Sequence, residues 1–325
     1  MSHLTTAQRY TISAMISQGE SQTNIATTID KSKSVISREI ARNGDQRNGE
    51  YRFDLAVKKA RERQESKTRH VRFTTEMQIR VDNLLRLDYS PEQVEGFCKS
   101  EGIACVSHER IYQHVWDDKK KGGNLHEHLR RKGRKYRKRG SSKDSRGILK
   151  DRVGIEERPA IVEEKTRFGD LEIDTIIGRN HKGAIVTIND RATGMLKMKK
   201  VKRRTAALVE TVAVGLLQTW KTNLKTITGD NGKEFANHKQ IATSLDIDFY
   251  FAQPYHSWER GANENLNGLI RQYIPKKTDF SLLSDEFIQE IENILNNRPR
   301  KRLKFKTPIF AMKELLSNQK VALVT

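Results

Sequence analysis

The chain has 325 residues, with 61 Lys and Arg against 41 Asp and Glu, a formal net charge of +20 and a pI near 9.9. This length allows two or three domains. The charge attracts polyanions, and nucleic acid is the leading candidate, although charge alone does not exclude a ribosomal or membrane-surface role. Cys98 and Cys105 lack metal-type spacing, which argues against a zinc ribbon or a disulfide scaffold. There is no apolar signal core, and no run approaches the ~18 apolar residues of a membrane span, so we expect a soluble intracellular protein.

Residues 3–44 predict three helices, of which the second and third have helix-turn-helix spacing. Ala26 is small enough for two helices to cross, Asp30 falls in the turn four residues later, and Ile36 follows ten residues after Ala26. Asp30 stands where glycine is usual, which weakens the match. The outer face of the third helix carries four candidate DNA contacts: Ser34, Ser37, Arg38 and Arg42. A solvated helix face would explain the same four residues.

A charged connector helix is predicted over residues 52–66, and a second helix-turn-helix candidate follows it. Residues 90–93, with the sequence SPEQ, form a capping box with proline at the first helical position. Ser107 can cap the next helix, whose outer face carries Arg110 as a candidate DNA contact. His108 and His114 are six residues apart, which does not place them on one helical face as metal ligands. Solvent or DNA contact is the better interpretation of both.

The stretch from residue 119 to residue 150 has fourteen Lys and Arg against two acidic residues. Such a block cannot pack a core and should be extended or disordered when free. Because it joins a DNA-reading half to a carboxylate-bearing half, we interpret it as a linker that follows phosphates; a solubilising linker is the alternative. Its candidate DNA contacts are Arg130, Arg131, Lys132, Arg134 and Lys135.

From residue 158 onward the pattern predicts the order βββαβαβα. LEIDTIIG alternates with period two and reads as a strand that carries Asp174, while LKTITGD reads as a strand that ends on Asp230. The order matches a ribonuclease-H-like fold with a mixed sheet, in which the first Asp sits on the central strand and the second at the end of its neighbour. A doubly wound α/β enzyme is the alternative, but no glycine-rich phosphate loop follows any strand.

The third acid of the site comes from the helix predicted over residues 257–273. Glu259 would lie in the first turn, where the helix dipole favours acids, and this explains it without a catalytic role. Glu264 lies off the apolar stripe, and Gly261 and Gly268 on its face leave bare backbone for metal and DNA. We therefore select Glu264.

Asp174, Asp230 and Glu264 would repel one another unless a divalent cation joined them, and their hard oxygen ligands suit Mg²⁺ or Mn²⁺. Two such ions can activate an attacking oxygen and stabilise a leaving one in phosphodiester chemistry. The three acids are thus predicted both to bind metal and to be catalytic, in a metal-dependent polynucleotidyl transferase.

Five motifs carry a resemblance to a known family: SKSVISREIARNG, IDTIIG, GDNGKEF, QPYHSWERGANENLNGLIRQYIPK and LNNRPRKRLKFKTP. The chain resembles, along nearly its whole length, a bacterial DDE transposase of the insertion-sequence family called IS-thirty. The resemblance assigns the catalytic triad to Asp174, Asp230 and Glu264. The last motif is basic without an acid and supplies Arg300 and Arg302 as candidate DNA contacts. Leu171 is a departure, since relatives often carry tryptophan there.

The resemblance implies a bacterial, cytoplasmic and nucleoid-associated enzyme that recognises terminal inverted repeats and performs strand cleavage and transfer, often through a circular intermediate. Two DNA ends must be joined in concert, so at least a homodimer is expected. The rivals are a retroelement-type integrase, which would have a His-His-Cys-Cys zinc module, a ribonuclease H proper, which would not need two helix-turn-helix modules, and a DNA-binding regulator with a degenerate core.

The expected architecture is therefore multidomain: all-α helix-turn-helix modules followed by an α/β, ribonuclease-H-like, integrase-type catalytic core. The expected boundaries are a first helix-turn-helix domain at 1–48, a connector helix with the second module at 49–118, a basic linker at 119–157 and the catalytic core at 158–325.

Overall fold

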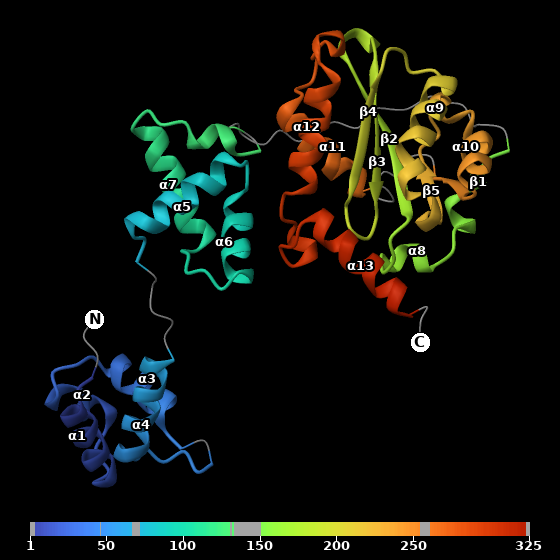
Figure 1. Ribbon diagram of the computed structural model, residues 1–325. Helices are drawn as coiled ribbons and strands as arrows, with labels where there is room; N and C mark the ends of the chain where they lie inside the picture. Colours follow the sequence, from blue (N-terminus) through green and yellow to red (C-terminus); the bar gives the residue numbers. More distant parts are fainter. Residues whose placement is uncertain are drawn as a thin grey trace. The chain divides into compact units, whose positions relative to one another are not determined.

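The computed structural model describes residues 4–45, 47–66, 72–130, 132, 151–253 and 261–322 (Figure 1). The chain divides into two compact units, Met1–Val71 and Arg72–Thr325. The first unit is helical, and the second combines helices with a mixed sheet. None of the helices in the described part of the chain has the length and apolar character needed to span a bilayer.

The first unit contains four helices: α1 (Thr6–Ser17), α2 (Gln22–Thr28), α3 (Lys33–Asn43) and α4 (Phe53–Glu65). Ala26 and Ile36 are buried in its core, and Asp30 adopts a left-handed φ of 53° in the turn between α2 and α3. The predicted helix-turn-helix geometry is therefore confirmed, with aspartate tolerated at the turn because its short side chain accepts αL backbone. Helix α4 packs on this unit through the buried Ala56.

The second unit begins with a helical region: α5 (Thr75–Arg86), α6 (Pro91–Ser100), α7 (His108–Lys120) and the 3₁₀ turn η1 (Leu125–His128). The predicted capping box is present, with Ser90 and Gln93 bonding reciprocally at the start of α6. Helix α7 runs to Lys120, and Leu125 and Leu129 are buried with the other apolar residues of this region. Order thus continues beyond residue 119, where the basic linker was expected to begin, because these two leucines supply apolar surface to bury.

The sheet has six strands in the order β1-β6-β5-β2-β3-β4. Strands β2, β3 and β4 are antiparallel neighbours, whereas β2, β5, β6 and β1 run parallel, which makes the sheet mixed as predicted. The strands are β1 (Val153–Gly154), β2 (Asp170–Ile177), β3 (Ala184–Asp190), β4 (Leu196–Val201), β5 (Thr226–Gly229) and β6 (Asp248–Phe251). Strand β1 was not predicted, since two residues are too short to show a period.

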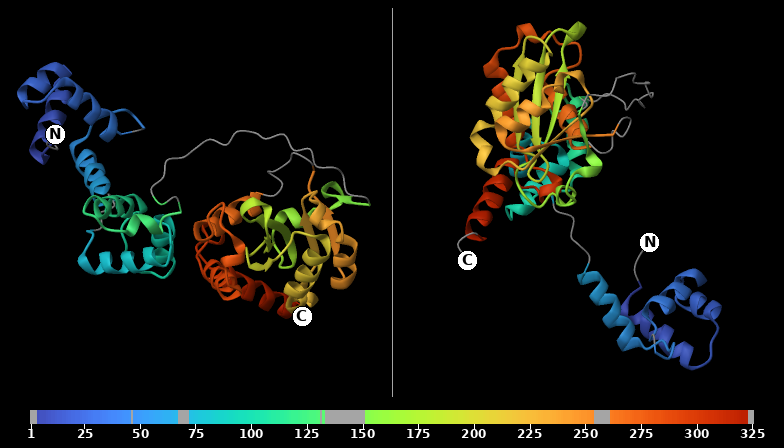
Figure 2. Two further views of the ribbon diagram at one scale, coloured as in Figure 1. Left: turned by 90° about the horizontal axis from the view of Figure 1, so that it is seen from above. Right: turned by 90° about the vertical axis from the view of Figure 1, so that its right-hand side faces the viewer.

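Helices cover both faces of the sheet (Figures 1 and 2). On one face, α9 (Ala206–Leu217) and α10 (His238–Leu245) bury the cluster that contains Leu171 and Ile173. On the other face, α11 (Gly261–Tyr273) and α12 (Asp285–Asn296) bury the cluster that contains Ile176. Alternate side chains of β2 therefore enter opposite cores, and the predicted order βββαβαβα is confirmed for β2 to α11.

Several short elements complete the second unit beyond the predicted ones. Helix α13 (Pro308–Ala322) places apolar side chains against the core that contains Leu171. The remaining elements are α8 (Ile161–Glu164), η2 (Ile155–Glu157), η3 (Arg179–His181), η4 (Gln218–Asn223), η5 (Lys233–Phe235), η7 (Phe280–Leu282) and η8 (Lys301–Leu303). Of these, η5 and η8 adjoin the candidate site residues discussed below.

Candidate active site

Two of the predicted catalytic acids lie at the same level on neighbouring parallel strands. In the pairing of β2 with β5, Glu172 is opposite Thr228. Asp174 lies two residues after Glu172 and is still on β2. Asp230 lies two residues after Thr228, directly after β5 ends at Gly229. Parallel strands lie about 4.8 Å apart, so this register brings the two carboxylate-bearing residues together at the carboxyl end of the parallel strands. Ligand and catalytic sites of α/β sheets commonly occupy that edge.

The third predicted acid lies on α11, which packs on the sheet face to which Asp174 points. Asn267 of α11 donates a hydrogen bond from Nδ2 to Oδ2 of Asp174 at 2.7 Å. Glu264 lies three residues before Asn267, so the two side chains project from the same side of the helix. Glu264 is exposed to solvent. The bond from Asn267 therefore ties the helix that carries Glu264 to the strand that carries Asp174.

Whether these acids can bind a metal ion depends on how many of their carboxylates lie close together. Within the described ranges, no group of three or more His, Cys, Asp or Glu side chains is close enough to hold a metal ion. Mg²⁺ usually takes only one or two protein carboxylates and completes its shell with water and substrate phosphates. Asp174 on β2 and Asp230 just after β5 fit that pattern, with Glu264 available from the neighbouring helix.

Glu234 is a buried acid beside the site to which the sequence analysis gave no role. It is 3% exposed, and its Oε1 accepts a hydrogen bond from Thr175 Oγ1 at 2.8 Å and lies 3.3 Å from Arg204 Nη1. Its Oε2 has no hydrogen-bond partner among the described residues. A Cβ built on Gly232 would lie 2.3 Å from Glu234 Oε2 and 2.8 Å from Asp230 Oδ1. Glu234 thus links the residue after Asp174 to the loop that holds Asp230. In the sequence, its position inside the GDNGKEF motif could have indicated a role for it beside Asp230.

The other acids of β2 belong to the structural core instead. Glu172 is 1% exposed and pairs with Arg191 at 2.5 Å, and Asp170 receives two bonds from Arg167 at 2.7 and 3.0 Å. A buried carboxylate that is already matched by a guanidinium is a poor ligand for a further cation. This pairing separates the structural acids of the strand from Asp174, which sequence alternation alone could not do.

Arg130 lies against the helix that carries Glu264. Its guanidinium donates to the side-chain Oδ1 of Asn265 at 2.9 Å and to the Asn265 backbone oxygen at 3.2 Å. A Cβ on Gly268 would lie 1.9 Å from Arg130 Nη2, so a larger residue there would displace the end of the Arg130 side chain. The bare backbone that we expected to accommodate metal and DNA therefore accommodates Arg130 at Gly268. At Gly261 a Cβ would meet nothing within 4 Å.

Arg300 and Arg302, the candidate contacts of the basic C-terminal motif, both bond backbone carbonyls. Arg300 donates to the Leu295 oxygen at 2.8 Å, and Arg302 donates to the oxygens of Arg191 and Ala192 at 3.0 and 2.9 Å. Burial lowers the pKa of Arg300 to about 10, with further lowering from the neighbouring arginines. Both side chains therefore stabilise the fold through these hydrogen bonds. The other N–H donors of each guanidinium group can still bind a ligand.

The remaining candidate DNA contacts are distributed over several segments. Ser34, Ser37, Arg38 and Arg42 are exposed on α3, as expected for an outer helix face. Arg110 is exposed on α7 and lies 5.4 Å from the centre of the Phe73 ring. Lys132 takes a left-handed φ of 47°. Arg131, Arg134, Lys135 and the alternative acid Glu259 lie outside the described residues.

The two histidines of α7 are engaged within the helical region. His108 Nδ1 lies 2.5 Å from Glu95, and this hydrogen bond raises the pKa of His108. His114 Nε2 lies 2.8 Å from Asp82. Both rings therefore stabilise the packing of α7 on its neighbours.

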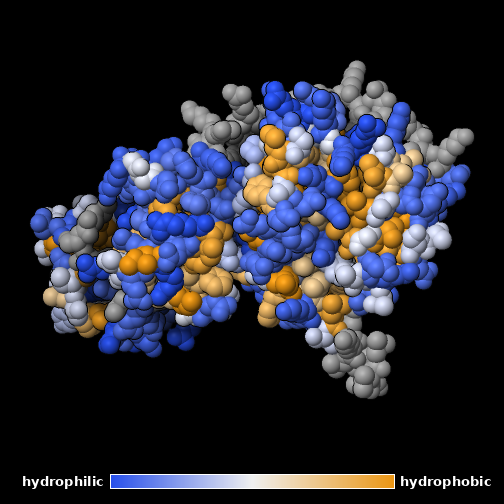
Figure 3. Space-filling model, turned by 45° about the horizontal axis from the view of Figure 1, so that its top comes forward, coloured by the Kyte–Doolittle hydropathy of each residue, from blue (hydrophilic) through white to orange (hydrophobic). Residues whose placement is uncertain are grey.

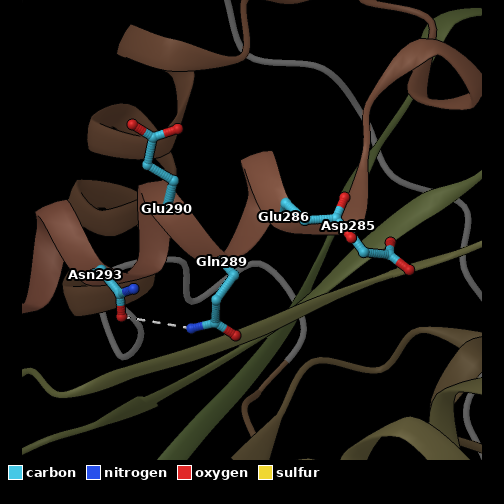
Figure 4. A pocket seen from close by; sticks show the side chains of 5 residues that line it. All are labelled: Asp285, Glu286, Gln289, Glu290 and Asn293. Carbon is cyan, nitrogen blue, oxygen red and sulfur yellow. Dashed lines mark hydrogen bonds between the residues drawn. The ribbon is translucent and has the colours of Figure 1, made fainter.

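An acidic surface on α12 contrasts with these basic segments. Figure 4 shows Asp285, Glu286 and Glu290 projecting from the exposed side of the helix, beside Gln289 and Asn293. Like charges there would repel a phosphate backbone. On the face seen in Figure 3, hydrophilic side chains predominate and hydrophobic ones gather in several patches.

Comparison with known proteins places these features in a family. A model described as a helix-turn-helix domain matches residues 1–43. The chain is 53% identical over 320 residues to the transposase for insertion sequence element IS4351 of Bacteroides fragilis, covering 98% of each protein. It is 31% identical over 324 residues to transposase InsI for insertion sequence element IS30A of Escherichia coli K12, covering 95% of this chain and 82% of that one. A putative integrase of Spiroplasma virus SpV1-R8A2 B is 27% identical over 182 residues.

A helix-turn-helix unit is typical of proteins that bind DNA. The similarities cover almost the whole chain, at identities of 53% and 31%. The chain therefore belongs to the family of insertion-sequence transposases that includes those of IS4351 and IS30, and the resemblance seen in the sequence motifs is confirmed.

Proposed function

We propose that this transposase binds the terminal inverted repeats of its insertion sequence and catalyses metal-dependent DNA strand cleavage and strand transfer through Asp174, Asp230 and Glu264. The observation that carries the proposal is the parallel register of β2 and β5, which supports joint action of the two aspartates. A ribonuclease-H-like, integrase-type core is the fold assignment that accounts for the mixed sheet and the position of these acids.

The residues around Asp174 suit a carboxylate that must keep a fixed direction. Its Oδ1 accepts the backbone N–H of Thr175 at 2.9 Å, while Oδ2 accepts the amide of Asn267. Asp230 Oδ1 likewise accepts the backbone N–H of Gly232 at 2.9 Å. Asp174, Asp230 and Glu264 would hold Mg²⁺ or Mn²⁺, which supplies Lewis-acid stabilisation of the reacting phosphate oxygens. These hydrogen bonds would orient the ligands before the metal binds.

Recognition of DNA is assigned to the helical segments and to the basic ones. The exposed face of α3, with Ser34, Ser37, Arg38 and Arg42, would enter the major groove, as the second helix of a helix-turn-helix does. Arg110 would contribute from α7. The basic segment that includes Arg130, Arg131, Lys132, Arg134 and Lys135 would contact phosphates, which position the protein without specifying sequence. Two ends must be joined together, so the active form is proposed to be at least a homodimer.

The experiment that tests this function compares Asp174→Asn with the unaltered protein. The variant should bind a terminal-repeat duplex with unchanged affinity and lose more than ~100-fold in strand cleavage. It alters a proposed metal ligand directly, whereas loss of a group that only orients such a ligand costs about 10–100-fold. Binding is measured in EDTA by fluorescence anisotropy, and cleavage is measured after Mg²⁺ is restored. Full cleavage by Asp174→Asn would refute the assignment.

A further inference from the structure

A pocket of about 290 Å³ lies where three segments of the second unit meet. The start of α6, the C-terminal segment before and within η8, and the side of α11 line it together with Arg130. Its volume is close to the lower end of the ~300–1,000 Å³ typical of ligand pockets. The residues lining the pocket are Ser90, Glu92, Gln93, Arg130, Asn265, Leu269, Arg298, Arg300, Lys301, Arg302 and Phe305.

The lining is strongly and unevenly charged. Five of these side chains are cationic and only Glu92 is anionic, and its Oε1 lies 3.4 Å from Lys301 Nζ. Within the part of the chain that the structure describes, no carboxylate forms an ion pair with Arg298, Arg300 or Arg302. Converging cations repel one another, and the repulsion grows as water is excluded. Asp88 offsets part of this repulsion at Arg298, and Asp190 and Glu172 offset part of it at Arg302. An anionic ligand would relieve the rest of it.

Arg298 is the most buried of these cations, at 2% exposed. Its Nε donates to Gln93 Oε1 at 3.0 Å, and its Nη1 donates to Gln272 Oε1 at 3.0 Å, so these two partners are neutral amides, while the Asp88 carboxylate acts on it electrostatically. Burial lowers the pKa of Arg298, and burial together with the charges of Arg298 and Arg302 lowers the pKa of Arg300. Keeping a buried guanidinium charged is costly, and an anion bound beside it would lower that cost.

The pocket also touches the active-site helix. Arg130 bridges to Asn265, the residue after Glu264, and Asn265 and Leu269 form part of the pocket lining. Gln93 joins the opposite wall, because its amide completes the capping box of α6 and also donates to the Pro299 oxygen at 2.5 Å. A group held in this pocket would therefore contact the second helix-turn-helix candidate, the basic C-terminal segment and the catalytic helix at once.

We propose that this pocket binds a backbone phosphate of the DNA substrate and so positions the DNA end relative to Glu264. The ligand chemistry is a phosphodiester anion, recognised by guanidinium forks that suit phosphate oxygens. The inference rests on the proposed function, since it names where that substrate is held. It adds a docking point outside the carboxylates and outside the exposed face of α3.

The test uses full-length protein in EDTA, with duplexes of the terminal repeat that each carry one neutral methylphosphonate in place of a phosphate. With the unaltered protein, a methylphosphonate at one position of the duplex should lower the affinity about tenfold, as expected for loss of a charge-assisted contact. In Arg300→Gln a methylphosphonate at the same position should cause no further loss of affinity, because both changes remove the same interaction. Arg300→Gln should also reduce the slope of log K against log salt by about 1.

Arg271→Gln is the matched control, because Arg271 also bonds backbone oxygens, those of Ile177 and Pro275 at 3.0 and 3.2 Å, and burial also lowers its pKa. It lies outside the pocket and should keep the methylphosphonate profile of the unaltered protein. Lys301→Gln provides a second test at an exposed pocket residue, should Arg300→Gln fail to fold. An unchanged profile in both pocket variants overturns the proposal.

A separate measurement distinguishes DNA from a small anion. Inorganic phosphate should raise the thermal unfolding temperature of the unaltered protein more than that of Lys301→Gln. If it does so while no methylphosphonate position is coupled to the pocket variants, the pocket holds a free anion only and the DNA assignment is refuted. All of these experiments measure binding in the absence of metal. Their outcome would therefore stand even if the catalytic assignment of Asp174 were wrong.

Discussion

The side-chain amide of Asn267 donates to the carboxylate of Asp174 across 2.7 Å, joining α11 to β2. This bond connects the two elements that carry the first and third acids of the proposed triad. It fixes one oxygen of Asp174 in direction, while the Thr175 N–H fixes the other. Such outer contacts orient a metal ligand before the metal arrives.

Asn267→Ala should therefore lower the rate of strand cleavage about 10–100-fold and raise the Mg²⁺ concentration needed for half-maximal activity. The change removes only the amide that orients Asp174. Cleavage rates measured over a Mg²⁺ titration test this. Asn293→Ala on the exposed side of α12 is the control and should leave both quantities unchanged. An Asn267→Ala enzyme with a normal metal requirement would show that the bond does not orient the ligand.

Glu264→Gln should abolish cleavage with little effect on repeat binding, whereas Glu259→Gln should retain substantial activity. The physical reason is that Glu264 lies on the side of α11 that Asn267 ties to Asp174. Cleavage of a labelled repeat duplex, normalised to bound DNA, measures both variants. The opposite ranking would move the third ligand to Glu259.

Glu234→Gln should raise the Mg²⁺ requirement and reduce cleavage about 10–100-fold while leaving repeat binding intact. Its carboxylate braces the residue after Asp174 and lies beside the Asp230 loop. Glu292→Gln is the matched control, because Glu292 is also buried, at 2% exposed, and receives the Met198 N–H at 2.6 Å on the opposite face of the sheet. Glu292→Gln should lose stability without a change in its Mg²⁺ requirement. If the two variants have the same Mg²⁺ requirement, the role of Glu234 is purely structural.

Gly96→Ala should destabilise the second unit by about 1–3 kcal/mol, because overpacking a fitted contact forces neighbours to move. A Cβ at Gly96 would lie 2.3 Å from ring atoms of Phe305, which docks the C-terminal segment on α6. Gly215→Ala is the control: a Cβ there would meet nothing within 4 Å, and this exposed helical position should gain about 0.5–1 kcal/mol. Chemical denaturation measures both. Equal stability of the two variants would exclude a tight Phe305 contact.

The sequence by itself determined the main helices and strands from residue 6 to residue 43 and from β2 to α11. Alternation in LEIDTIIG, the capping box of residues 90–93 and the spacing from Ala26 to Ile36 are local patterns, and each recurs in the structure because period and capping depend on neighbouring residues. The family also followed from the sequence, since its motifs extend along the chain.

Only the tertiary structure decided which partners each polar residue meets. Glu172 and Asp174 share one alternation, yet Arg191 neutralises the first and Asn267 meets the second. Glycine at 268 reads as open backbone in sequence, whereas Arg130 fills that space. Arg298 and Arg300 read as part of an exposed basic run, yet burial and neighbouring arginines lower their pKa. These differences arise because the electrostatic environment of a charge is set by groups distant in sequence, which local patterns do not encode.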